Sequence, residues 1–319
     1  MRRLLTLTVV ALSALGCQTT TKTTNGPRLL IRPEQAKKID LKLTGAIAGD
    51  QAGFVYLVTP TNVMRYDPKV NQIEPMLVDP AQDITGVSGT PEGVMLRLLE
   101  QKLVGPHKYI SDVAVTPDGV VLVLLPQELD AYVAGHLVKV HSVPAPALMV
   151  SCDREFAYIL AATEKGAKLL RYHLTGGAKG TTDTVLTTQD CPRALQAVPG
   201  GCLVASGGNI VKVTDPVQAP GETGPHVATV LLVAIGEDVT SVAVDPRKSY
   251  VYFATEDATF VWAQGQILPV FPAGSRLLWV DDTLTICQPS VGQLVQIGSV
   301  SGHVQKLLAG EKKASPSKR

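Results

Sequence analysis

The sequence contains little charge and few aromatic side chains. Of its 319 residues, 18% are charged and 5% are aromatic, and 29 Lys and Arg against 28 Asp and Glu leave a formal net charge of +1. A nearly neutral chain has no general electrostatic attraction to nucleic acid or to anionic lipid. Because 45% of the residues are hydrophobic, the chain can still build a real core, in one large or two small domains. We therefore expect a globular protein that binds no nucleic acid.

The chain also lacks an apolar run long enough to cross a membrane. The apolar segment Leu4–Leu15 is shorter than the roughly 20 residues that a span requires. It follows two positive residues, Arg2 and Arg3, and small residues surround its end. This arrangement is typical of a secretory signal peptide. We predict that residues 1–16 form a signal peptide that is removed from the mature protein.

A cysteine, Cys17, stands at the processing point, and a Thr-rich polar stretch follows it. The pattern resembles a bacterial lipoprotein signal, in which the cysteine becomes the first mature residue and carries the lipid. Ala14 stands where that signal usually has leucine, and Ala14 with Gly16 also suits ordinary secretory cleavage, so a secreted or periplasmic protein is the alternative. Gln18, directly after the cysteine, resembles the residue found at this position in lipoproteins that are sorted to the outer membrane. The resemblance implies lipidation at Cys17, a polar tether over residues 17–40, and anchoring to the outer membrane facing the periplasm.

Helical periodicity is absent over any three-turn window, and the only short helix candidate is Arg32–Leu43. Instead, a theme recurs: a short apolar strand, a turn rich in Gly, Pro or Asp, and a more hydrophobic strand. The clearest copies are Ile110–Leu125 and Val239–Thr255, and Pro192–Gly208 is a weaker one. β-Branched strands separated by such turns predict β-hairpins.

The hairpins and the strands after them predict an all-β fold, a β-propeller over residues 41–309 with a flexible basic tail at 310–319. Four strands per unit at roughly 40-residue intervals is the spacing of propeller blades. Hairpins start near residues 43, 84, 110, 146, 192, 239 and 275, which predicts seven blades. The second unit is short, and the count falls to six if it belongs to a neighbour.

Two of these segments, "VAVTPDGVVLVL" and "VAVDPRKSYVYFAT", resemble the repeated hairpin of bacterial propeller proteins of the NHL and YVTN type. The resemblance implies the fold and carries almost no information on function. The WD40 signature is absent. Trp262 and Trp279 are the only tryptophans, and they form no tryptophan-docking motif of the quinoprotein propellers.

Four further cysteines, an even number, could form disulfides in an oxidising compartment: Cys152, Cys191, Cys202 and Cys287. In adjacent blades, Cys152 would end a first strand and Cys202 would begin a second strand near the same rim. A Cys152–Cys202 bridge is therefore the candidate disulfide, and four buried thiols are the alternative. None of these cysteines has metal-ligand spacing.

No residue is predicted to be catalytic or to bind a cofactor or metal. The six histidines are scattered, and His136 and His141, five residues apart on one strand, would point to opposite faces. Only four asparagines are present, a poor supply for a calcium site like that of propeller lactonases. Asp112 falls on an innermost strand, whereas Asp153, Asp245 and Asp281 fall in turns, where turn capping explains them.

Two functions follow from this pattern. The first is a non-enzymatic envelope binding or scaffold protein that presents the propeller surface to a protein, peptide or glycan, with no cofactor. The alternative is a metal-dependent propeller hydrolase, lyase or lactonase with its site in the central channel, and the sequence leaves a divalent metal there open.

Overall fold

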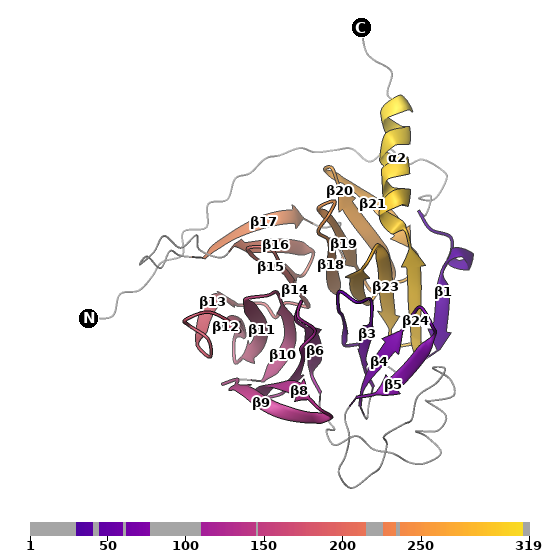
Figure 1. The fold of residues 1–319 in the computed structure, drawn as a ribbon. Coiled ribbons are helices and arrows are strands. Elements are labelled where there is room, and N and C mark those ends of the chain that lie inside the picture. Colours follow the sequence, from indigo (N-terminus) through magenta and orange to yellow (C-terminus); the bar gives the residue numbers. More distant parts are fainter. Residues whose placement is uncertain are drawn as a thin grey trace.

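The computed structural model of the chain describes residues 30–40, 45–59, 62–76, 110–144, 146–214, 226–233 and 237–314. Within these residues, six four-stranded antiparallel sheets stand around a central axis as the blades of a β-propeller (Figure 1). The fold is thus the all-β propeller that the recurring hairpins predict.

In the first five blades the strands follow one another from the axis outward. Blade 1 contains β2 (Ile47–Gly49), β3 (Val55–Val58), β4 (Val63–Asp67) and β5 (Gln72–Pro75); blade 2 contains β6 (Asp112–Val115), β7 (Val121–Leu125), β8 (Glu128–Val133) and β9 (His136–Ser142). Blade 3 contains β10 (Ala147–Cys152), β11 (Phe156–Thr163), β12 (Gly166–His173) and β13 (Thr182–Thr188). Blade 4 contains β14 (Ala194–Val198), β15 (Gly201–Ser206), β16 (Asn209–Thr214) and β17 (Val227–Val233); blade 5 contains β18 (Ser241–Asp245), β19 (Tyr250–Ala254), β20 (Thr259–Ala263) and β21 (Gln266–Phe271).

Both ends of the chain build blade 6. It contains β22 (Arg276–Val280), β23 (Thr283–Gln288) and β24 (Gln293–Gly298), and its outermost strand is β1 (Lys37–Asp40), which follows the 3₁₀ turn η1 (Pro33–Gln35). The strand β1 runs antiparallel to β24, with Ile39 opposite Leu294. These residues lie inside the segment expected to be a tether. The pairing closes the ring, which removes the open ends that a linear stack of sheets would leave.

The prediction of seven blades is wrong, because the ring has six. The innermost strand β2 packs against β6 on one side and against β22 on the other. No seventh sheet therefore separates blade 1 from blade 2 in the described ring. The hairpin predicted to start near residue 84 lies outside the described residues.

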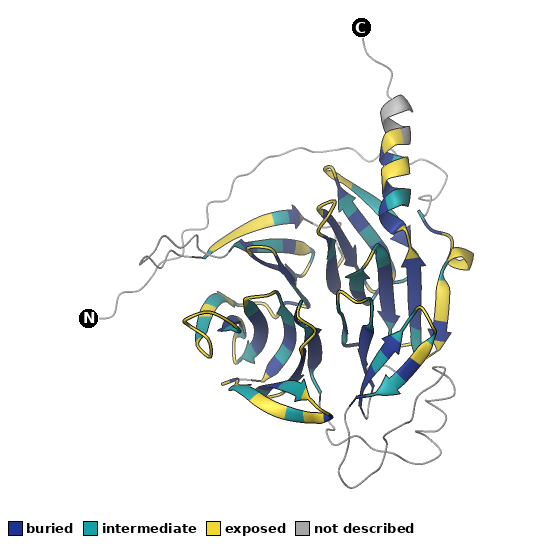
Figure 2. Ribbon diagram, viewed as in Figure 1, coloured by how far each residue is buried: buried dark blue, intermediate teal, exposed yellow. Residues whose placement is uncertain are grey.

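Burial changes from the axis to the rim of each blade (Figure 2). All residues of β3, β7 and β19 are buried, because second strands are covered on both faces by neighbouring blades. This explains their continuous apolar sequences. On the outermost strand β9, by contrast, no residue is buried. The core thus consists of apolar layers between blades rather than one central mass, and it leaves the axis free to form a channel.

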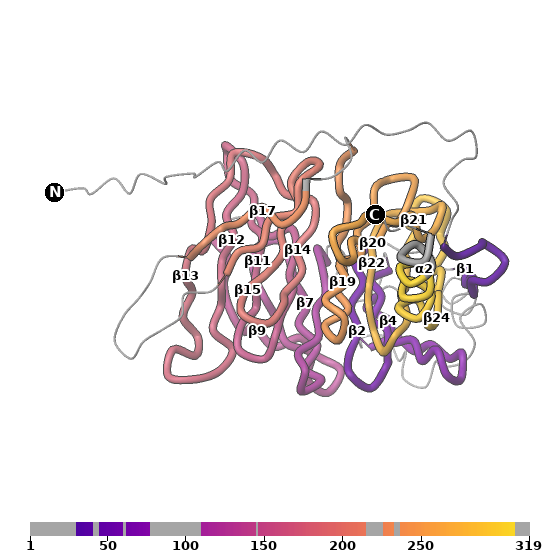
Figure 3. Tube along the Cα trace, turned by 90° about the horizontal axis from the view of Figure 1, so that it is seen from above, coloured from indigo at the N-terminus to yellow at the C-terminus, as the bar shows by residue number. Residues whose placement is uncertain are grey.

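The C-terminal segment forms the helix α2 (Val300–Ala314), where no helix was expected. Val300, Val304 and Leu308 lie one turn apart and are buried together with residues of blades 5 and 6. Seen from above, α2 lies beside these two blades (Figure 3). No helix in the described part of the chain is long and apolar enough to cross a membrane.

Candidate functional site

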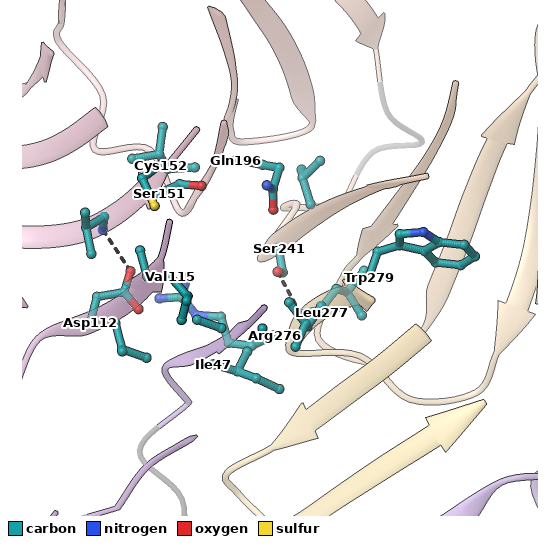
Figure 4. A pocket seen from close by; sticks show the side chains of 18 of the residues that line it. Ile47, Asp112, Val115, Ser151, Cys152, Gln196, Ser241, Arg276, Leu277 and Trp279 are labelled. Atoms are coloured by element: carbon teal, nitrogen blue, oxygen red, sulfur yellow. Dashed lines mark hydrogen bonds between the residues drawn. The ribbon is translucent and has the colours of Figure 1, made fainter. Parts of the chain in front are cut away.

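The six innermost strands surround a polar cavity of about 160 Å³ on the axis of the ring. Each blade contributes through its first strand, and the polar side chains that line the cavity come from five of these six strands. They are Asp112 on β6, Ser151 and Cys152 on β10, Gln196 on β14, and Ser241 with Arg276 on β18 and β22 (Figure 4). A cavity assembled from widely separated segments can form only after the ring has closed.

Three of these side chains join neighbouring blades through backbone hydrogen bonds. Asp112 Oδ2 accepts from Val150 N at 2.9 Å, and Ser241 Oγ accepts from Leu277 N at 2.9 Å. Ser151 Oγ accepts from the backbone N of the blade 4 residue Ala197 at 2.8 Å. An innermost strand has a free edge whose N–H groups need partners when buried. The side chains of the preceding blade supply these partners, which explains part of the polar lining as structural.

Arg276 spans the channel. It is the first residue of β22 in blade 6, and its Nη1 lies 3.7 Å from the sulfur of Met149 on β10, in the opposite blade of the ring. Figure 4 shows the side chain extending toward Asp112. Both Arg276 and Asp112 begin their strands, so the two charges lie at the same end of the channel. We call this end the floor.

Asp112 is buried in the floor, with 7% of its surface exposed. Burial raises the pKa of its carboxyl group to about 6, although the nearby Arg276 and the backbone hydrogen bonds oppose this rise. A buried carboxylate is costly unless opposite charge and hydrogen bonds compensate for lost hydration. Here the compensation is incomplete, so the fold retains a charge that lowers its own stability. Such groups are concentrated at functional sites.

The opposite end of the channel widens into a cavity of about 880 Å³, which we call the mouth. The turns that follow the innermost strands frame it, together with the first turns of α2. Its polar and aromatic lining is mixed in charge and consists of Asp50, Gln51, Thr116, Cys152, Gln196, Asp245, Arg247, Lys248, Trp279, Asp281, Asp282, Ser301 and Gln305. The mouth shares Gln196 and Trp279 with the channel cavity, and it is therefore the route by which a ligand would reach the floor.

A buried hydrogen-bonded network fixes α2 at the edge of the mouth. Asp245 Oδ2 accepts from Ser301 Oγ at 2.5 Å, and Tyr252 donates to the same serine at 3.3 Å. The Tyr252 ring stacks on Trp279, with centroids 4.9 Å apart and an interplanar angle of 11°. Burial raises the pKa of the Tyr252 hydroxyl, which keeps it a donor. The rim around Trp279 is consequently rigid.

The structure assigns the residues singled out in the sequence to different places. Cys17 lies outside the described residues. Cys152 lines both cavities and is a free thiol, whereas Cys202 is buried in the core between blades 3 and 4. The predicted Cys152–Cys202 bridge is not formed in the structure, because the two side chains occupy these different surroundings.

Asp112 and Asp153 lie where their sequence context predicted, whereas Asp245 is the last residue of β18 and caps the turn that follows it. Asp112 lies on an innermost strand. Asp153 Oδ1 accepts from the backbone N of Phe156 at 2.8 Å, and Asp245 Oδ1 accepts from that of Arg247 at 2.9 Å, so both cap turns. Sequence reasoning missed Arg276, because only the closed ring brings it opposite Met149. The sequence carries no signal for this crossing.

The channel does not fit a divalent metal. Among the described residues, no group of three or more His, Cys, Asp or Glu side chains is placed to hold a metal ion. Among the channel residues that the structure describes, Asp112 is the single carboxylate, and the guanidinium of Arg276 already supplies a positive charge beside it. Hard cations such as calcium require six or more oxygen ligands. A second cation in this space would be repelled.

Comparison with known proteins supports the fold and no narrower relationship. No protein-family model matches the chain, and no curated protein matches it in sequence. Among solved structures it is similar to a gluconolactonase from Xanthomonas campestris, with a TM-score of 0.58 and 11% identity over 82% of this chain and 89% of that one. It is also similar to an auxiliary nutrient binding protein from Bacteroides thetaiotaomicron, with a TM-score of 0.57 and 8% identity over 81% and 69% of the two chains. At these identities the likeness shows a β-propeller alone.

Proposed function

We propose that the protein is a non-enzymatic binding module of the bacterial cell envelope, whose mouth docks a protein, peptide or glycan partner. The observation that carries this proposal is the mouth itself, a cavity of about 880 Å³ at the end of the channel. Cavities of roughly 300–1,000 Å³ with a few convergent polar groups are the usual form of ligand sites. Side chains of both signs, Arg247 and Asp282 among them, suit a polar partner with hydrogen-bonding groups along its length.

The rigidity of the mouth supports docking rather than closure around a substrate. The stack of Tyr252 on Trp279 and the hydrogen bonds of Ser301 hold the rim in place. A preformed aromatic surface binds with little loss of conformational entropy. A sugar ring or a planar peptide group is a suitable occupant for such a surface.

The location in the envelope is part of the same proposal. Cys17 would carry the lipid, and the segment after it would hold the propeller away from the outer membrane on its periplasmic side. Replacing Cys17 with Ser should release the protein into the soluble periplasmic fraction, as measured by fractionation of cells that express each form. Unchanged membrane retention of the C17S protein would contradict the anchor.

A metal-dependent hydrolase, lyase or lactonase is the second candidate, because one similar structure is a gluconolactonase. The donor set of the channel argues against it, as described above. Elemental analysis of the purified protein tests the point directly. A stoichiometric divalent metal whose removal by EDTA abolishes hydrolysis of a lactone would favour this second candidate over docking.

Site-specific photo-crosslinking in intact cells tests docking at the mouth. A photoreactive residue would replace Lys248, which is exposed and lines the mouth. The control position is Lys165, which is also exposed but lies in the turn between β11 and β12, at the other end of the blades. We expect a discrete adduct from position 248 and none from position 165. Identical adducts from both positions, or none from either, would contradict docking at the mouth.

A further inference from the structure

We propose that the channel floor recognises a single carboxylate group of the ligand, and that Arg276 is the residue that binds it. This inference rests on the proposed function, since the group must enter through the mouth. Arg276 stands at the far end of the cavity from the mouth, and a ligand that fills the channel ends against its guanidinium.

The guanidinium of Arg276 has unused hydrogen-bonding capacity. Such a group carries five N–H donors in a planar fork that matches a carboxylate. The hydrogen-bonding partner that the structure gives it is the sulfur of Met149, at 3.7 Å, and a thioether is a weak acceptor. Within the described part of the chain, no carboxylate forms an ion pair with Arg276. Arg276 also lines the polar cavity, where its remaining donors are available to a ligand.

Asp112 shapes the selectivity of this site. Its Oδ2 is held by Val150 N, and it attracts Arg276 from a distance beyond direct contact. The negative charge of Asp112 offsets most of the positive potential of Arg276, so a higher negative charge on the ligand brings little extra attraction. Recognition then depends on the match between the planar guanidinium fork and a carboxylate. Asp112 also keeps the empty floor nearly neutral, so an unpaired buried charge is avoided before the ligand arrives.

The size and the walls of the cavity agree with this ligand class. Its volume is about 160 Å³, and one water needs roughly 10–15 Å³ on the same measure, so a group of several heavy atoms fits. Ser151 and Gln196 line the wall between the floor and the mouth. Because Ser151 Oγ accepts from Ala197 N, its own hydroxyl proton is available to a further polar group of the ligand.

The carboxylate could belong to a small free acid or to the C-terminus of a peptide, and the experiment separates these sources. Isothermal titration of the purified mature protein would use propionate, a tripeptide with a free C-terminus, and the same tripeptide amidated, all at equal ionic strength. Binding of propionate indicates a free acid, and binding of the tripeptide alone indicates a chain end. Binding of the amidated tripeptide as tightly as the free one, or no binding of either acid, would overturn the inference.

Two variants make the test specific to the floor. Arg276→Met keeps the side-chain length and removes the charge, and we expect it to weaken carboxylate binding at least about tenfold. Asp112→Asn removes the repelling charge, and we expect it to tighten binding several-fold. A purely structural role of the pair would not move affinity in opposite directions. Equal affinity in all three proteins would refute the assignment, and Asp112→Asn decides it alone if Arg276→Met does not fold.

A failure of the carboxylate inference can be told apart from a failure of the docking proposal. If Arg276→Met leaves the crosslink at position 248 intact and carboxylates do not bind, the mouth docks a partner and the inference about the floor is wrong. If position 248 forms no specific crosslink, the docking proposal fails whether or not propionate binds.

Discussion

Replacing Asp112 with Asn should stabilise the propeller at neutral pH, even though Asp112 accepts a native hydrogen bond. Asparagine has nearly the same shape, and its carbonyl oxygen can still accept from Val150 N. What it removes is the buried charge. The pKa of Asp112 rises from its ordinary value of 3.8 to about 6 in the folded protein, which means that folding disfavours the ionised form.

The magnitude follows from that difference. Going from 3.8 to about 6, at about 1.4 kcal/mol for each pH unit, corresponds to about 3 kcal/mol of stability lost when the carboxyl is ionised. The attraction to Arg276 is already contained in this figure, because it is one of the causes that set the pKa. The value is an upper bound for the stabilisation by Asp112→Asn, since the amide must also find a place for its two N–H groups.

Whether stability rises or falls with pH depends on which state, folded or unfolded, binds the proton of Asp112 more tightly. Between pH of about 4 and 6 the folded protein binds a proton at Asp112 that the unfolded chain releases, so a rise in pH through this window lowers stability. Below about 4 both states are protonated and the penalty vanishes. The stabilisation by Asp112→Asn should therefore be near zero at pH 4 and largest above pH 7.

Urea denaturation followed by circular dichroism at pH 4, 6 and 8 measures this difference. In a thermal melt at pH 8, a gain of about 3 kcal/mol would raise Tm by roughly 4–5 °C, because the unfolding entropy is about 2.1 cal/mol/K for each of the 319 residues. Asp118→Asn, at an exposed position of the turn after β6, is the matched control and should show no such trend. The reasoning is refuted if Asp112→Asn destabilises at pH 8, or if its effect is the same at every pH.

Two other substitutions test the closure of the ring and the attachment of α2. In Gly49→Ala the new methyl group would overlap Val280 of β22, so we expect a loss of about 1–3 kcal/mol in urea denaturation; Gly298→Ala, where nothing lies in the way, is the control, and equal losses would contradict this account of closure. Ser301→Ala removes the donor to buried Asp245 and should cost about 1–3 kcal/mol, with faster amide hydrogen exchange in the first turns of α2; unchanged exchange there would show that the network does not fix the helix.

Local sequence predicted the blades well because hairpins depend on neighbouring residues. The segment Ile110–Leu125 forms β6 and β7 around a Pro-Asp-Gly turn, and Val239–Thr255 forms β18 and β19. The alternation of apolar and polar residues, the β-branched residues and the turn residues all act within about a dozen positions. They can therefore be recognised in the sequence before the fold is known. The helix α2 was missed although Val300, Val304 and Leu308 repeat at helical spacing, because the stripe is short and polar residues surround it.

The sequence by itself therefore determined the kind of unit, an antiparallel hairpin with two apolar faces that only neighbouring blades can cover. The tertiary structure decided the number of units, because six sheets and a strand from the N-terminal segment close the ring where the repeats suggested seven. It also decided the site. Asp112, Ser151, Gln196 and Arg276 are ordinary strand residues along the chain, and they converge only because the first strand of every blade faces the same axis.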